Sequence, residues 1–443
     1  MKWRPYPSYR NSGVKWIGRI PQDWHIRKLK QIASVRPSGV DKDSLPGEEP
    51  VLLCNYVDVY NNEHITVDLA LMNATATRSE IEKFGLQVGD VIVTKDSESW
   101  GDIAVPAYVP RLMDGVVCGY QLALVRPNPD LIDGNFLFRS FSSRGINDQF
   151  RVAANGITRY GLGQHWLRSG LFCIPSVDEQ RAIAAFLDRE IERIDALIAK
   201  KERQVELLQE KRTALISHAV AKGLDPNAPM KDSSVEWLGE IPAHWSVVRC
   251  KAVFSEVDER SEFGTEELLS VSHITGVTPR SEKNVTMFMA ETLEDYKKCR
   301  TGDLVINTMW AWMGALGTAS QHGVVSPSYN VYRFRRAGPN ARYYDRLFRT
   351  GRFVAEINRF SQGVWKSRLG LYPEEFLQIR IPYPPDLEQA AIALFLDREA
   401  ARIDELVSKV QGSIETLREY RTALVSAAVT GKIDVRQEGG GGF

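Results

Sequence analysis

A long segment without helix breakers constrains the fold of this chain more than any other feature. The residues from Glu179 to Ala221 include no proline or glycine and are rich in Ala, Leu, Glu, Lys, Arg and Gln, which favour helices. Their apolar side chains recur at alternating steps of three and four residues, the heptad pattern of a coiled coil. Such a helix would extend roughly 60 Å, and we expect it to span a gap between two bodies. The seam comprises Leu187, Ile191, Ile194, Ile198, Lys201, Val205, Leu208, Arg212 and Leu215.

The same pattern returns near the end of the sequence, from Glu388 to Thr430. Each seam position lies 209 residues after its counterpart (396 − 187), and an arginine, Arg212 or Arg421, occupies the same heptad position in both. Matching seams predict that the two helices pair with each other. The alternative is that each helix packs separately on its own domain. The second seam comprises Leu396, Ala400, Ile403, Val407, Val410, Ile414, Leu417, Arg421 and Leu424.

A shorter motif also occurs twice, once ahead of each helix. The pattern Trp-x-Gly-x-Ile-Pro-x-x-Trp runs from Trp16 to Trp24 and again from Trp237 to Trp245, an offset of 221 residues (237 − 16). The chain therefore consists of two repeats, each with a head (the tryptophan motif), a body (the segment that follows it) and a long helix. The first repeat carries twelve more residues (221 − 209), which we expect in loops. We predict that the head tryptophans anchor on a core and do not stack on a ligand.

The segments between head and helix indicate mixed, mainly β bodies. Residues 89–93 and 302–306 each predict a turn followed by a buried strand. Further strands and then one amphipathic helix per body are predicted, with the strands at 50–54, 116–125 and 324–334 and the helices at 135–154 and 341–360.

These patterns divide the chain into five parts. We predict a first body over residues 1–178, a helix over 179–222, a second body with its turn-rich linker over 223–385, a helix over 386–434 and a tail over 435–443. The predicted fold class is α+β, with two mixed, mainly β bodies joined by two long helices.

Signatures of catalysis, metal binding and membrane insertion are missing from the sequence. There is no phosphate-binding GxxxxGK[ST] loop, no GxGxxG after a strand, no GxSxG and no HExxH. The five cysteines are scattered without a CxxC pair, which favours a reducing cytoplasm over a disulfide or zinc framework. No apolar run reaches the length of a membrane span. We therefore predict a cytoplasmic, non-catalytic chain without a metal. Asp188 and Asp397 are interpreted as exposed helix residues or docking contacts, not as active-site acids.

Basic residues gather in both bodies although the formal net charge is +0. They predict contact with phosphates, whereas the alternative is a solvated helix face. The second body contributes Arg333, Arg335, Arg336, Arg342, Arg346, Arg349, Arg352, Arg359, Lys366 and Arg368, and the first contributes Arg126, Arg139, Arg144, Arg151, Arg159 and Arg168.

Loop position, polarity and equivalence between the repeats select the candidate DNA-contacting residues. Base edges must be read by polar and planar groups, and aromatic residues are interleaved with the basic ones. The candidates in the first body are Lys95, Ser97, Trp100, Gln121, Arg159 and Tyr160. Those in the second body are Asn307, Trp310, Trp312, Asn330, Lys366 and Arg368.

Taken together, these motifs resemble the specificity subunit of a type I restriction-modification enzyme. The resemblance rests on the repeated Glu-Gln-x-x-Ile-x-x-Phe-Leu-Asp blocks at 179–188 and 388–397, the Arg-Thr-Ala-Leu helix ends at 212–215 and 421–424, and the two heads. It covers nearly the whole chain. It implies that the helices form an antiparallel coiled coil, that a pseudo-twofold axis relates the repeats, and that each body is a target recognition domain for one half of an asymmetric, bipartite site in double-stranded DNA.

The resemblance also implies partners and cofactors. Two methyltransferase (modification) subunits would dock on the helices, and restriction/translocase subunits would complete the complex. S-adenosylmethionine, ATP and Mg would then bind on those partner subunits and not on this chain. Two other readings stay open. One is an adaptor whose coiled coil joins two protein-binding modules, and the other is a nuclease that acts alone and would need a cluster of metal-binding carboxylates.

Overall fold

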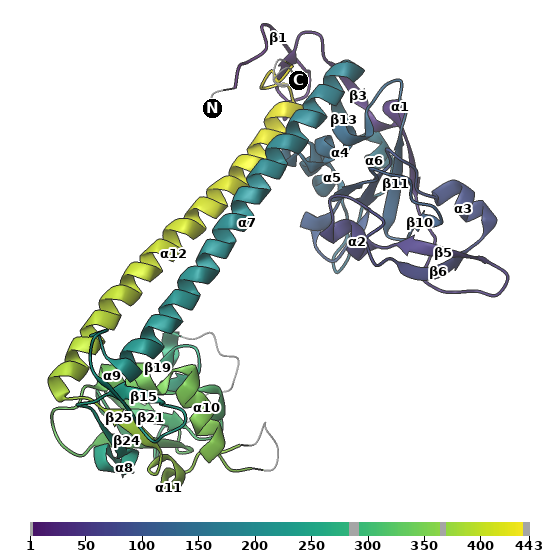
Figure 1. Ribbon diagram of the computed structural model, residues 1–443. Coiled ribbons are helices and arrows are strands. Elements are labelled where there is room, and N and C mark those ends of the chain that lie inside the picture. Colours follow the sequence, from purple (N-terminus) through teal and green to yellow (C-terminus); the bar gives the residue numbers. More distant parts are fainter. Residues whose placement is uncertain (1–2, 283–291, 364–368, 437–443) are drawn as a thin grey trace. The chain divides into compact units, whose positions relative to one another are not determined.

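The structure is a computed structural model that describes residues 3–282, 292–363 and 369–436 (Figure 1). The fold is α+β. The chain divides into two compact units, one comprising residues 1–201 and 412–443 and the other residues 202–411. Each unit contains one body and one end of each long helix, because the units divide within the helices, after residues 201 and 411.

The two long helices are α7 (Val177–Lys222) and α12 (Asp386–Val429). The first begins two residues before its expected start and ends where expected. The second begins where expected but ends before residue 434, because the chain turns at Gly431, whose φ of 68° lies in the left-handed region. Every predicted seam residue on both helices is buried or half-buried.

An equivalent arginine–aspartate ion pair joins the two long helices in each unit. In the first unit, Arg421 Nε lies 3.0 Å from Asp195 Oδ1. In the second, an Arg212 guanidinium nitrogen lies 3.3 Å from Asp404 Oδ1. The two ion pairs are equivalent, because Asp404 follows Asp195 and Arg421 follows Arg212 by the same 209 residues (404 − 195 and 421 − 212). The arginines that interrupt the apolar seams therefore have their partners on the facing helix.

The first unit is built on a four-stranded sheet in the order β4-β11-β7-β9, with a three-stranded sheet β10-β5-β6 beside it. Its elements are β1 (Tyr9–Asn11), β2 (Arg19–Pro21), β3 (His25–Lys28), α1 (Leu29–Ile32), β4 (Ala33–Pro37), β5 (Glu49–Cys54), α2 (Tyr56–Asn61), β6 (Met72–Ala76), α3 (Arg78–Phe84), β7 (Val91–Thr94), β8 (Asp96–Ser97), η1 (Trp100–Asp102), β9 (Pro106–Tyr108), β10 (Val116–Cys118), β11 (Leu122–Pro127), α4 (Gly134–Ser142), α5 (Arg144–Ala153), β12 (Tyr160–Gly161), α6 (Gln164–Ser169) and β13 (Leu171–Ile174).

The second unit repeats the four-stranded sheet in the order β17-β24-β21-β22. Its elements are β14 (Met230–Asp232), β15 (Glu240–Pro242), β16 (Ser246–Arg249), α8 (Cys250–Val253), β17 (Phe254–Val257), β18 (Leu269–Ser272), β19 (Gly276–Pro279), η2 (Arg280–Glu282), β20 (Lys297–Cys299), β21 (Leu304–Asn307), η3 (Ala311–Met313), β22 (Leu316–Thr318), β23 (Gly323–Val325), β24 (Tyr329–Phe334), α9 (Ala341–Phe348), α10 (Gly351–Phe360), α11 (Pro373–Phe376) and β25 (Arg380–Tyr383). The second tryptophan of each head, Trp24 and Trp245, is fully buried in the core of its unit.

Four predicted elements are each divided in two. The helix predicted at 135–154 is α4 and α5, because Ser143 adopts an extended conformation between them. The helix at 341–360 is α9 and α10, and the Thr350 hydroxyl caps the second by accepting the N–H of Phe353. The strand at 116–125 is interrupted by Gln121, which has a φ of 69°. The strand at 324–334 is likewise divided into β23 and β24.

The two bodies differ most after the first strand of the smaller sheet. In the first body, residues 55–71 connect β5 to β6 and contain α2. In the second body, β18 turns into β19 through residues 273–275 alone. Insertions of this kind are tolerated in loops. The connection supplies the first body with side chains that have no counterpart in the second.

A buried glutamine fastens each body to its helix. The Gln180 side chain is fully buried. Its Oε1 accepts the backbone N–H of Asp133 at 2.7 Å, and its Nε2 donates to the carbonyls of Pro175 and Leu131 at 2.9 and 3.1 Å. We call this arrangement a glutamine socket. It explains why the Glu-Gln block is repeated, because the glutamine satisfies main-chain groups that would otherwise be buried without partners.

The second body has the same socket. Gln389, also fully buried, accepts the N–H of Asn340 at 2.9 Å and donates to the carbonyl of Pro384 at 2.9 Å. About two turns further along each helix, the repeated aspartates dock on the adjoining body. Asp188 accepts a hydrogen bond from Asn135 on α4, and Asp397 pairs with Arg342 on α9 at 3.0 Å. Of the two interpretations of these aspartates, docking contacts is therefore the one that the structure supports.

In the first unit a carboxylate from the long connection joins two arginines. Glu63 lies 3.0 Å from Arg139 on α4 and also pairs with Arg421 on α12. The Arg139 side chain is 3% exposed and also contacts Asp188 at 2.8 Å. Burial alone would raise the pKa of Glu63, but the two guanidinium groups outweigh it and lower that pKa below its usual value.

This lowered pKa predicts how stability depends on pH. The contribution of Glu63 is fully present above the unfolded pKa of about 4.3 and is lost as pH falls through the lower folded value. We expect Glu63→Gln to reduce the free energy of unfolding by about 1 kcal/mol at neutral pH, allowing for the screening of a carboxylate that is 40% exposed. Urea unfolding between pH 3 and 7 should show a shallower acid decline in the variant. Glu82, which is 72% exposed in its ion pair with Arg78, serves as the control when changed to Gln and should leave the decline unchanged. If the free energy of unfolding falls with decreasing pH equally steeply in the Glu63→Gln and Glu82→Gln variants, the prediction is contradicted.

Candidate nucleic-acid interface

Most of the predicted basic field is neutralised within each body. Arg126 forms a bidentate pair with Asp90 at 2.8 Å, and Arg333 forms the equivalent pair with Asp303 at 3.0 and 2.8 Å. The local density of basic residues therefore overstates the positive charge that each body presents, because acids from distant parts of the sequence pair with arginines such as Arg126 and Arg333. Further paired arginines of the field are Arg139, Arg151, Arg336, Arg342, Arg346, Arg349 and Arg359.

A few cations of the field remain exposed and unpaired. Within the described part of the chain, no carboxylate forms an ion pair with Arg144, Arg159, Arg168 or Arg352, and each of these side chains is exposed. Of these four, only Arg159 was also selected as a base-contacting candidate. It lies at a cleft in the first body.

That cleft has a volume of about 530 Å³ and is lined by side chains from four segments. The end of β7 leads into β8 and η1, which supply one wall, and α2 supplies the opposite wall. Gln121, held in the left-handed region before β11, and Arg159, just before β12, complete the lining. The lining residues are Tyr56, Tyr60, Asp96, Ser97, Glu98, Ser99, Asp102, Gln121 and Arg159.

The structure brings the candidates of the first body together around this cleft. Ser97, Gln121 and Arg159 line it. Tyr160 lies opposite Ser97 in the β8–β12 pair. Two other candidates flank the cleft. Trp100 begins η1 with 54% of its surface exposed, and Lys95 is half-buried against the neighbouring Asp96.

The chemistry of the cleft combines aromatic faces with hydrogen-bond acceptors. The rings of Tyr56 and Tyr60 stack 5.7 Å apart at an interplanar angle of 12°. Burial raises the pKa of Tyr56, whose hydroxyl lies 3.0 Å from the Ser97 hydroxyl and keeps its proton. Three carboxylates (Asp96, Glu98 and Asp102) face a single arginine. The carboxylates suit amino donors, such as those that cytosine and adenine present in the major groove, whereas Arg159 is the cation of the lining that suits a phosphate.

Sequence reasoning missed six of these lining residues, among them Ser99, which lies two residues after the candidate Ser97. Tyr56 and Tyr60 lie on the long connection that has no counterpart in the second body. Candidates were selected partly by equivalence between the repeats, so residues of this connection were not considered. The spacing of the two tyrosines at positions i and i+4 could have indicated a shared aromatic face, since such residues lie on one side of a helix. The three carboxylates, Asp96, Glu98 and Asp102, were missed because the search favoured basic and aromatic residues.

The candidates of the second body are arranged differently. Trp310 is 52% exposed and stacks on Trp312 with centroids 6.5 Å apart and rings inclined by 17°. Asn307 and Asn330 are buried, and the Asn330 side chain donates to the Thr308 hydroxyl at 3.1 Å. They therefore hold the loop that carries the tryptophans. The remaining candidates, Lys366 and Arg368, lie outside the described residues.

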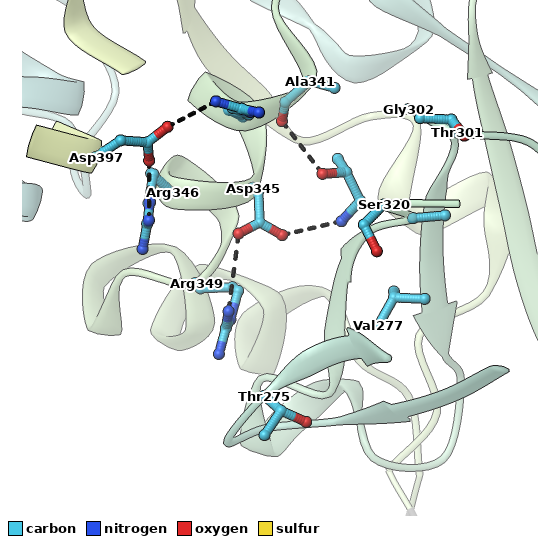
Figure 2. A pocket seen from close by; sticks show the side chains of 13 residues that line it. Thr275, Val277, Thr301, Gly302, Ser320, Ala341, Asp345, Arg346, Arg349 and Asp397 are labelled. Atoms are coloured by element: carbon cyan, nitrogen blue, oxygen red, sulfur yellow. Dashed lines mark hydrogen bonds and ion pairs between the residues drawn. The ribbon is translucent and has the colours of Figure 1, made fainter. Parts of the chain in front are cut away.

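A second cavity, of about 460 Å³, lies in the second unit between α9, α12 and the β18–β19 turn. Figure 2 shows Asp397 beside Arg346, and Asp345 between Arg349 and β22. Hydroxyl groups complete the lining, among them Thr275, Thr301, Thr318 and Ser320. The cavity is near the start of β21, whereas the candidate base-contacting residues follow its end.

Neither a metal centre nor a membrane segment is found in the parts of the chain that the structure describes. No group of three or more His, Cys, Asp or Glu side chains is placed to hold a metal ion in residues 3–282, 292–363 and 369–436. In the same ranges, no helix has the length and apolar character needed to cross a bilayer. The five cysteines are free thiols, and all are buried.

Comparisons with known proteins match the chain over nearly its whole length. No family model matches it. The MjaX protein of Methanocaldococcus jannaschii, assigned as a type I restriction enzyme specificity subunit, is 22% identical over 95% of this chain and 96% of its own length. The MjaVIII specificity subunit of the same organism is 21% identical over 94% and 95%.

Two solved structures share the fold. One, from a study of complex assembly and conformational transition of the type I R-M system, gives a TM-score of 0.68 at 17% identity and covers 94% of this chain and 99% of its own. The HsdS subunit from Thermoanaerobacter tengcongensis gives 0.58 at 17% identity, covering 94% and 98%. With the head, body and helix present twice, this chain is similar over nearly its whole length to curated type I restriction enzyme specificity subunits.

Proposed function

We propose that this chain supplies DNA sequence specificity to a type I restriction-modification complex, each body reading one half of an asymmetric, bipartite site. The observation that carries the proposal is the cleft of the first body, where candidate residues from separate loops line one cavity with stacked aromatic rings and acceptors for base edges. Major-groove edges distinguish all four base pairs. In the second body, the stacked pair of exposed Trp310 and half-buried Trp312 is the corresponding candidate surface.

The two long helices would fix the spacing between the half-sites. The equivalent ion pairs of Arg421 with Asp195 and of Arg212 with Asp404 support an antiparallel coiled coil with a pseudo-twofold relation between the repeats. A rigid antiparallel pair sets the distance between recognition surfaces, as dimer geometry does for other DNA-binding proteins. Because the loops of the bodies differ, the half-sites would differ too.

The chain would also assemble the enzyme without catalysing a reaction itself. Two modification subunits would bind the outer faces of the helices, and restriction/translocase subunits would join them. The partners would bring S-adenosylmethionine, ATP and Mg, and the assembled complex would act as an adenine-specific methyltransferase and ATP-dependent endonuclease. We propose the cytoplasm as its location, where the buried free cysteines would stay reduced.

The proposal is tested by mapping methylated adenines on host DNA after co-expression with a modification subunit from the same genome. We expect one asymmetric bipartite motif with a fixed gap. Folded protein that binds neither the modification subunit nor DNA in a salt-dependent manner would refute the assignment and favour the adaptor reading. Cleavage by this chain alone would favour the nuclease reading.

The cleft makes a more local prediction. Arg159→Gln should weaken binding to the methylated-motif duplex by about fivefold to tenfold and lower the salt slope by about one, because one exposed cation is lost from the interface. Arg78→Gln is the control, since Arg78 is also an exposed arginine of the first body but lies on α3, outside the cleft. Fluorescence anisotropy at several salt concentrations would measure both. Equal effects of the two substitutions would remove Arg159 from the interface.

A further inference from the structure

The cavity of the second unit occupies the place that Glu63 fills in the first. Tyr108 and Thr318 are equivalent, since each pairs with the first residue of the central strand, Val91 or Leu304. In the first body, the backbone N–H of Tyr108 donates to the carbonyl of Glu63 at 2.9 Å. In the second body, the backbone N–H of Thr318 donates instead to Asp345 Oδ1 at 3.0 Å, and both residues line the open cavity.

The arginines are equivalent as well. Arg139 and Arg346 each lie six residues after the cap of the first helix, Asp133 or Asn340 (139 − 133 and 346 − 340). Each contacts the repeated aspartate of its long helix, at 2.8 Å for Arg139 and 3.1 Å for Arg346. The repeats therefore present the same arginine to the same position.

Of the two equivalent arginines, only Arg139 forms an ion pair with a second carboxylate. Arg139 is also bound by Glu63 at 3.0 Å and is almost fully buried. Arg346 has Asp397 alone among the described residues, and 26% of its side chain is exposed toward the cavity. The short turn at 273–275 explains the difference, because the second body has no long connection to deliver an acid.

We propose that this cavity receives a carboxylate side chain from a protein partner, which takes the place that Glu63 holds in the first body. Arg342, Arg346 and Arg349 line the cavity with two aspartates, which leaves one positive charge in excess and suits a single carboxylate. Its hydroxyls add neutral donors. The cavity lies beside α12 and away from the loop of Trp310, so a protein docked on the helix reaches it more readily than DNA held by that loop.

The site itself is tested on the full chain with acetate as the probe. Arginine side-chain Nε–Hε resonances should show a saturable shift for Arg346, with half-saturation on the order of 10 mM at constant ionic strength. Arg346→Gln should abolish the shift, and Arg249→Gln, an exposed arginine of the same unit on β16, should leave it unchanged. Thr275→Glu, which supplies an acid from the turn itself, should weaken acetate binding by about tenfold. Absence of a saturable shift would overturn the site.

The identity of the occupant is tested separately, and this second part rests on the proposed function. Arg346→Gln and Thr275→Glu should each weaken binding of the modification subunit by about tenfold while changing the affinity for non-specific duplex less than twofold. If duplex affinity falls and subunit affinity does not, the cavity holds a DNA phosphate and the proposal of a protein carboxylate is wrong. If neither changes although acetate binds, the partner assignment is also wrong. Acetate binding does not depend on the proposed function, so the two failures are distinguishable.

Discussion

Replacing Arg139 with methionine should lower the free energy of unfolding by about 3 kcal/mol, the largest loss of stability that we expect from any single ion-pair residue. The guanidinium is buried and holds Glu63 and Asp188 together. Removing one partner of a buried pair costs about 3–5 kcal/mol, because the remaining charges are left uncompensated. The lower end applies here, since both carboxylates are about 40% exposed and can be partly hydrated. For a unit of this size the midpoint of thermal unfolding should fall by roughly 6–12 °C.

Arg346→Met is the matched control for this substitution. It removes the equivalent arginine, but that side chain is 26% exposed and has Asp397 as its carboxylate. We expect a loss of about 1 kcal/mol, as for ion pairs near the surface. Chemical unfolding of the full chain would measure both variants. Equal losses would show that the Glu63 contact adds nothing to the stability of the first unit.

Exchanging the first body should produce the largest change in DNA recognition. Replacing residues 1–178 with the corresponding segment of another specificity subunit should alter one half of the methylated motif and leave the other half and the gap unchanged. The exchange carries the body side of the socket, the main-chain groups of Leu131, Asp133 and Pro175, and leaves Gln180 on α7. Each mismatched base pair costs about 1–3 kcal/mol, so three changed pairs should reduce binding to the original site more than about a hundredfold.

The reciprocal exchange provides the control. Replacing residues 223–385 should alter the other half of the motif and preserve the first. Methylation mapping of both hybrids distinguishes the possible outcomes. If one exchange changes both halves of the motif or alters the gap, the bodies do not recognise DNA independently. The proposal that each body recognises one half-site is then wrong.

The long helices could be predicted from sequence to within a few residues because their signal is local. A heptad seam over one continuous segment sets their limits, with neither Pro nor Gly from Glu179 to Ala221 and only Gly412 from Glu388 to Thr430. The break between α4 and α5 gave no comparable signal. Ser143 lies between them in an extended conformation, and a serine within an amphipathic pattern does not by itself end a helix.

The electrostatics of the bodies could not be predicted because partners meet across long sequence separations. Arg126 finds Asp90 across 36 residues, and Arg139 finds Glu63 across 76. Counting charges in a window therefore overstated the basic field. The candidates of the first body lie close together, because Ser97 follows the framework strand β7 and Tyr160 pairs with Ser97 in the β8–β12 pair. The tyrosines of α2 lie in a segment that the repeat does not contain.

The glutamine sockets have a consequence for how such a protein can diverge. Gln180 and Gln389 bind the bodies through main-chain N–H and carbonyl groups, which every residue type other than proline provides. Selection for a secure attachment therefore places little demand on the side chains of the body. Substitutions can therefore accumulate in the loops of the bodies while the hydrogen bonds of the sockets are retained. The loops can change without loss of the attachment between body and helix. Relatives that retain about a fifth of the sequence over its full length are what such a division between attachment and variation would leave behind.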